Sequence, residues 1–151
     1  MKIQYIKGHL LTAPQCIIAH GCNSHGVMGS GVARVIREKY SYAFEKYHAE
    51  YKKNGLVLGS VVFAAPMPES DEPIVANCIT QQNFGSNGEV YVDYAAIRSC
   101  MKNLEEFCIM TFIDSIGLPM IGAGLGGGDW TKISSIIEDE LKETIPVVYQ
   151  L

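Results

Sequence analysis

Two glycine-rich stretches decide the fold of this chain: IIAHGCNSHGVMGSGVA at residues 17–33 and MIGAGLGGGDW at residues 120–130. Each one begins with or follows a short, apolar, β-branched run, which is typical of a fully buried strand. Each then passes through a glycine loop into residues with helical spacing. In open α/β sheets, ligands bind at the carboxyl ends of the strands, where such loops lie. The two stretches therefore predict an α/β domain with a ligand site between them.

The rest of the chain alternates between apolar runs and amphipathic stretches. We predict further strands at residues 3–8, 58–65, 74–79, 116–121 and 147–149, and helices at residues 32–40, 42–53, 93–104 and 130–141. Residues 108–113 fit either a helix end or a strand, and we favour a strand. Strands that alternate with helices predict a mixed or largely parallel sheet with helices on both faces. Without an internal repeat or a linker, residues 1–151 are expected to form one domain.

Composition and charge exclude several classes of protein. The formal net charge is −4 and no block of Lys and Arg occurs, so we expect no extended nucleic-acid surface. A nucleotide-like ligand would have to be held by backbone donors. No run of eighteen apolar residues occurs, so we expect no membrane span. We also expect a monomer that needs neither a metal nor a cofactor, since the four histidines have no metal-binding spacing.

The cysteines indicate a reducing compartment. There are five, and none forms a Cys-x-x-Cys pair or a zinc-type spacing. Cys16, Cys78 and Cys108 lie in apolar runs and are predicted to be buried. The first five residues alternate like a strand and lack the apolar core of a signal peptide. These features favour a cytoplasmic protein.

The glycine content of the loops favours a phosphate-binding site. Glycine allows close approach of the backbone to a ligand, and free N–H groups at a helix start favour phosphate oxygens. Five of the seven residues from Gly122 to Gly128 are glycine, whereas a turn needs one or two. Either loop taken alone fits a tight strand-to-helix turn equally well. Together they predict a diphosphate held from both sides, in a site that matches neither the Walker nor the Rossmann motif.

Three side chains in these loops are candidates for chemistry. His20 ends a buried strand, where a neutral imidazole could transfer a proton or could simply cap the strand. Asn23 could hold a ribose hydroxyl or a water molecule, or could form the turn before the helix. Asp129 precedes a helix, so it is expected to be an N-cap, and it could also act as an acid or base. His25, in the first loop, is expected to be exposed, and we assign it no chemical role.

The order and spacing of these motifs resemble the macrodomain superfamily, and within it the yeast and phage ADP-ribose 1″-phosphate phosphatases. The matching segments are residues 20–33, 79–81, 119–125 and 148–151. The resemblance implies a three-layer α/β/α fold with a central mixed, mostly parallel sheet. It also implies that ADP-ribose, or ADP-ribose 1″-phosphate, lies across the top of that sheet. Because the phosphatase branch carries a histidine at the position of His20, the resemblance favours its catalytic role.

The resemblance also implies which residues contact the ligand. The second loop would wrap the diphosphate, and the first loop would reach the distal ribose. The implied contacts are Gly8, His9, Leu10, Asn23, Met28, Gly29, Ser30, Gly31, Val32, Thr80, Gln81, Gly122, Ala123, Gly124, Leu125, Gly126 and Tyr149.

Three positions depart from the pattern of related macrodomains. Most of them carry an aspartate after the first strand that contacts adenine, where this chain has His9. The branch that removes ADP-ribose carries a lysine and an aspartate at the positions of Gln81 and Gly126. Because glutamine cannot form a Schiff base, that covalent mechanism is excluded at this position. We therefore expect hydrolysis of ADP-ribose 1″-phosphate to ADP-ribose, by His20, Asn23 and Asp129. The alternatives are an ADP-ribosyl hydrolase acting on protein or nucleic acid, and a non-catalytic ADP-ribose-binding module.

Overall fold

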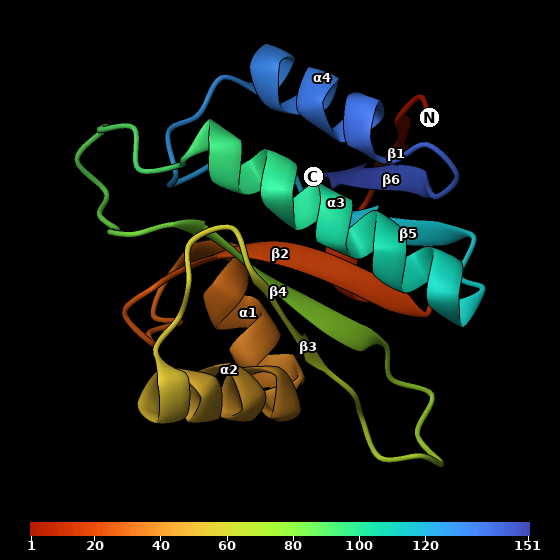
Figure 1. Ribbon diagram of the computed structural model, residues 1–151, viewed down its shortest axis with the longest axis horizontal. Helices are drawn as coiled ribbons and strands as arrows, with labels where there is room; N and C mark the ends of the chain where they lie inside the picture. The colour runs from red at the N-terminus through yellow and green to blue at the C-terminus, as the bar shows by residue number, and fades with distance from the viewer.

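A computed structural model describes all residues, 1–151, and places the apolar runs in one six-stranded sheet (Figure 1). The strands are β1 (Gln4–Lys7), β2 (Ile17–Asn23), β3 (Val61–Ala64), β4 (Ile74–Gln81), β5 (Ser115–Leu118) and β6 (Ile145–Gln150). Their order across the sheet is β1-β6-β5-β2-β4-β3. All neighbouring strands run parallel except β3, which is antiparallel to β4. The predicted mixed, mostly parallel sheet is confirmed.

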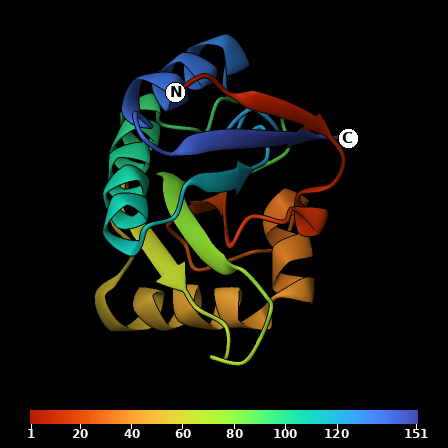
Figure 2. The same cartoon turned by 90° about the vertical axis from the view of Figure 1, so that its right-hand side faces the viewer.

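The helices cover both faces of this sheet. They are α1 (Gly31–Lys39), α2 (Ser41–Asn54), α3 (Tyr94–Thr111) and α4 (Trp130–Glu140), with a short 3-10 helix, η1, at Leu10–Thr12. Figures 1 and 2 show α3 and α4 on one face and α1 and α2 on the other. No helix combines the length and the apolarity that crossing a membrane requires.

The position of β2 in the sheet explains why its first three residues are all apolar. Ile17 and Ala19 pack into the core beneath α3 and α4, whereas Ile18 packs into the core beneath α1. Successive side chains of a strand point to opposite faces, so a strand between two helical layers must be apolar on both. The apolar run that precedes the first glycine loop thus makes β2 a central strand.

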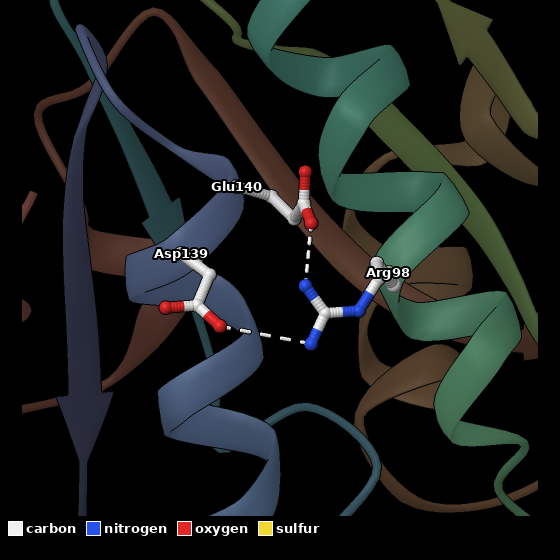
Figure 3. Close-up of polar contacts among 3 residues, drawn as sticks. All are labelled: Arg98, Asp139 and Glu140. Carbon is white, nitrogen blue, oxygen red and sulfur yellow. Dashed lines mark hydrogen bonds and ion pairs between the residues drawn. The ribbon is translucent and has the colours of Figure 1, made fainter.

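Helices α3 and α4 are also joined by a small ion-pair cluster. Arg98 of α3 lies between two carboxylates of α4, with 2.5 Å from Nη1 to Glu140 Oε2 and 3.6 Å from Nη2 to Asp139 Oδ2 (Figure 3). Because Arg98 is partly exposed, solvent screens the pairs and the apolar contacts of the two helices dominate. Together these contacts fix α4, whose first residue follows the second glycine loop.

Glu105 ties α3 to the turn that leads from α4 into β6. Its carboxylate accepts backbone N–H bonds from Lys142, Glu143 and Thr144 at 2.6–3.1 Å, and a bond from the Thr144 hydroxyl at 2.7 Å. Burial opposes ionisation of the carboxyl, but these four donors outweigh it and lower its pKa. Glu105 therefore belongs to the scaffold.

We expect Glu105→Gln to destabilise the fold by roughly 1–3 kcal/mol, because an amide replaces a charged acceptor of three backbone N–H groups and a buried hydroxyl. Urea denaturation at pH 7 measures this loss. The matched control is Glu106→Gln, on the same helix, which should change stability little. Equal stability of the Glu105 variant and the parent would contradict this assignment.

Two local predictions are wrong. Residues 108–113 are not a strand: α3 continues to Thr111 and ends at Phe112, whose N–H bonds to the carbonyls of Cys108 and Ile109. Of the short apolar run there only Cys108 continues the buried face of the helix, whereas Ile109, Met110 and Phe112 are exposed at its end. The run therefore resembles a buried strand only in sequence. Cys16 is exposed, because it lies one residue before β2 at the edge of the core. Cys78 and Cys108 are buried, as predicted.

Candidate functional site

Three loops meet at one edge of the sheet. Strands β5, β2 and β4 are adjacent and parallel, so the loops that follow them share an edge. The first glycine loop follows β2 and the second follows β5. A Cβ placed on Gly31 would lie 3.3 Å from Leu125 Cδ1, so the two glycine loops touch. The structure thus brings the two predicted loops together.

The second loop contains glycines of two kinds. Gly122 and Gly127 have φ angles of 78° and 70°, and a Cβ on Gly128 would lie 2.6 Å from Val92 Cγ1. These positions need glycine for the turn itself, as the plain turn interpretation requires. Gly124 differs: it is exposed, its φ is not positive, and a Cβ there would have no neighbour within 4 Å. Nothing in the folded chain requires glycine at that position.

The first loop contains a matching position. Gly29 is exposed, and a Cβ there would also have no neighbour within 4 Å. Ser30 is the N-cap of α1, but its side chain makes no capping hydrogen bond. The N–H groups at the start of α1 are therefore not capped by this side chain, and they carry the partial positive charge of the helix N-terminus. Each loop thus has one glycine that folding does not explain.

Asn23 organises the first loop. Its Nδ2 donates to Val27 O at 2.9 Å, and its Oδ1 accepts from the N–H of His25 at 2.9 Å. The Tyr47 hydroxyl donates to Asn23 O at 2.7 Å. The turn-forming interpretation of Asn23 is confirmed, and its contact with a ligand stays a prediction. The Met28 side chain is buried in the core, so only its backbone is available to a ligand.

His20 lies beneath the site rather than in it. Its side chain is fully buried, and Nε2 lies 2.6 Å from Asn77 Oδ1 on the neighbouring strand β4. Asn77 in turn donates to the carbonyls of Ala43 and Val62. Burial lowers the pKa of His20 to about 4, and the bond to Asn77 offsets this only in part. This placement argues against the predicted proton transfer, because neither a ligand nor water reaches the ring.

Asp129 caps helix α4. Its Oδ1 accepts the N–H of Thr131 at 2.9 Å, and its own N–H donates to the Tyr94 hydroxyl at 3.0 Å. The N-cap interpretation is confirmed. The carboxylate is exposed beside the second loop, so its role as acid or base stays a prediction.

The β1 side of the same edge carries a small apolar cavity. Its volume is about 60 Å³, and its lining residues include Gly8, His9, Leu10, Val32 and Tyr149. His9 Nδ1 accepts the N–H of Leu11 and thereby caps η1. The structure gathers five of the implied contact residues here, although their contact with a ligand stays a prediction.

A larger hollow, of about 470 Å³, lies away from these loops. It is lined by residues that include Lys102, Ile109 and Lys142, around the C-terminal half of α3. Helix α3 has 18 residues. Its two ends are therefore about 27 Å apart, with the second loop at the other end. We assign the candidate site to the glycine loops, where the backbone donors are.

Segment 81–93 joins the site from β4. Thr80 is fully buried and its hydroxyl has no hydrogen-bond partner. Gln81 Nε2 donates to Asn83 O at 2.7 Å, and a Cβ on Gly126 would lie 3.1 Å from Gln81 Oε1. Gln81 thus lies between this segment and the second loop.

A model of the Macro domain family matches residues 19–137 of this chain. This protein is a macrodomain. It is 30% identical over 148 residues to an ADP-ribose 1″-phosphate phosphatase of Candida albicans, covering 91% of this chain and 92% of that protein. It is 34% identical over 142 residues to an uncharacterised 17.5 kDa protein of phage T4, and the match covers 91% of this chain and 89% of that protein. The fold also matches a solved structure of a protein of unknown function from Bacteroides thetaiotaomicron, with a TM-score of 0.87 and 33% sequence identity. The match covers 100% of this chain and 99% of that one.

Sequence reasoning missed two parts of the macrodomain's site. Tyr47, which holds the first loop through Asn23, lies on α2, a helix to which the sequence assigned no part of the site. Its only signal is the four-residue spacing from the buried Ala43 on α2. The contact between His25 Nε2 and Asn83 Oδ1, at 2.9 Å, joins segments 58 residues apart. No local pattern could have shown it.

Proposed function

We propose that this macrodomain binds ADP-ribose 1″-phosphate across its glycine loops and hydrolyses it to ADP-ribose and phosphate. The observation that carries the proposal is the pair Gly29 and Gly124. Both are exposed at the site, and neither is required by packing or by its φ angle. Glycine in such positions allows the backbone to approach a ligand closely. The hydrolase class is supported by the phosphatase name of the Candida albicans relative.

The diphosphate would lie between the second loop and the start of α1. Backbone N–H groups of both segments would donate to its oxygens, helped by the α1 dipole. This mode fits the sequence, because residues 21–33, 80–93 and 119–131 contain no Lys or Arg. The apolar cavity beside Tyr149 would take the adenine ring, with His9 replacing the usual aspartate. The distal ribose would then lie at the opposite, β4 side.

Hydrolysis of the 1″-phosphate breaks a phosphorus–oxygen bond: water adds to phosphorus, and the ribose keeps the 1″ oxygen. A group that accepts a proton from the water, or donates one to the ribose oxygen, accelerates this step. Asp129 is the exposed carboxylate beside the second loop, and we assign it that role. Asn23 would position the reacting groups through the loop that it organises. His20 supports the floor of the site from below.

We expect the protein to bind ADP-ribose at least about tenfold more tightly than AMP, the equivalent of one charge-assisted hydrogen bond. The reason is that AMP lacks the second phosphate and the distal ribose, which the two loops would contact. Titration calorimetry with both ligands measures the ratio. Equal affinities would mean that the loops do not hold the diphosphate.

The activity itself is tested by phosphate release from ADP-ribose 1″-phosphate. Asp129→Asn keeps an oxygen that can accept the Thr131 N–H, so it separates helix capping from proton transfer. Strong loss of turnover with unchanged ADP-ribose affinity supports the assignment. ADP-ribose binding without any phosphate release identifies a binding module instead, and release of ADP-ribose from modified protein or DNA identifies a glycohydrolase.

A further inference from the structure

His25 lies where the first glycine loop meets the segment after β4. The N–H and the hydroxyl of the preceding Ser24 both lie within hydrogen-bond distance of Gln82 O, at 3.4 and 3.1 Å. His25 Nε2 lies 2.9 Å from Asn83 Oδ1. Asn83 O accepts from Gln81 Nε2, which reaches the second loop near Gly126. The imidazole therefore lies where the first loop meets the segment after β4, and Gln81 of that segment lies beside the second loop.

The His25 ring is held although it is exposed. Its backbone N–H donates to Asn23 Oδ1, and its ring meets Phe84 edge-on, with centroids 5.9 Å apart at 74°. Because an amide oxygen only accepts, Nε2 must carry the proton of the bond to Asn83. Nδ1 is not used in that bond. A side chain fixed in this way loses little entropy when it binds a ligand.

This junction lies at the distal-ribose end of the proposed ligand. The cavity beside Tyr149 adjoins β6, whereas Asn83 follows β4, three strand spacings away in the sheet order. Three spacings correspond to about 14 Å, so an elongated ligand with adenine at β6 ends near β4.

His25 is the only side chain in the three loop segments that can become cationic. Residues 21–33, 80–93 and 119–131 contain one histidine, His25, and no Lys or Arg. His20, directly before the first of these segments, is buried. An anionic group on the distal ribose would meet this side chain together with backbone donors. We propose that His25, held by Asn83, contacts the phosphate on C1″ and sets the preference for phosphorylated over unphosphorylated ADP-ribose. This inference rests on the proposed function.

The test compares two ligands that are not turned over: ADP-ribose, and ADP-ribose carrying a phosphonate at C1″. Calorimetry should show that the parent prefers the phosphonate by about 10–100-fold, the range for one hydrogen bond to a charged group. His25→Ala should lose most of that preference, while its Kd for ADP-ribose changes less than about twofold. Asn83→Leu, which removes the acceptor, should reduce the preference in part.

Two further variants keep the test specific. His25→Lys restores a cation and should recover part of the preference. His48→Ala removes a histidine of α2 that stacks on Phe44, and it should alter neither affinity. The inference is overturned if the parent shows no preference, if His25→Ala keeps it, or if His25→Ala weakens both ligands equally. In those cases ADP-ribose binding together with phosphate release from ADP-ribose 1″-phosphate still supports the proposed function, whereas a parent that does not bind ADP-ribose removes both.

Discussion

Gly124→Glu is expected to abolish ADP-ribose binding while leaving the fold intact. Gly124 is exposed and its φ is not positive, and a Cβ there would meet no atom within 4 Å, so a side chain costs the folded chain little. In the proposed complex the same side chain would occupy the diphosphate site and place a negative charge against it. We expect affinity to fall by roughly 100-fold or more, about 2.7 kcal/mol.

Calorimetry for affinity and thermal melting for stability give the two readouts. Gly124→Gln has the same bulk without the charge, so the difference between the two variants isolates the electrostatic part. Gly126→Ala is the contrasting control, because its Cβ would lie 2.8 Å from Gly122 O and should lower the melting temperature. If Gly124→Glu melts like the parent and ADP-ribose still raises its melting temperature equally, the second loop is not the phosphate site.

The two glycine stretches predicted the fold because their signals are local and repeated. At both β2 and β5, a short apolar run before a glycine loop indicates a buried strand. Because helices connect successive strands, the sequence also indicates that these strands run parallel. The signal failed where an apolar window was short, as at residues 108–113, where α3 continues. Six residues in a mostly apolar window cannot distinguish a helix end from a strand.

The site was predicted less completely, because burial depends on distant segments. Alternation along β2 places His20 on the same face as Ile18, but only the packing of α2 shows that this face is closed above it. The partner of His20, Asn77, lies 57 residues later and becomes its neighbour through strand register. The sequence also suggested that His20 ends the strand, whereas β2 continues to Asn23. From the sequence alone, a catalytic and a structural role therefore fit His20 equally well.

The burial of His20 predicts a specific loss of stability in mild acid. The unfolded chain takes up a proton at His20 as the pH falls below about 6.5, whereas the folded protein does so only near pH 4. A lowered pKa in the folded state means that the stabilising contribution is complete above pH 6.5 and is lost progressively down to about pH 4. At 1.36 kcal/mol per pKa unit, the loss is roughly 3 kcal/mol.

Urea denaturation at pH 7.5, 5.5 and 4.5 measures this slope. His20→Gln has no titrating group, so it should be less stable than the parent at pH 7.5 but should lose much less stability towards pH 4.5. Glu105 does not interfere, because its lowered pKa places its loss below about pH 4.5. If the stability of His20→Gln fell with pH as steeply as that of the parent, the imidazole would not be buried in its neutral form. His20 would then again be a candidate acid or base.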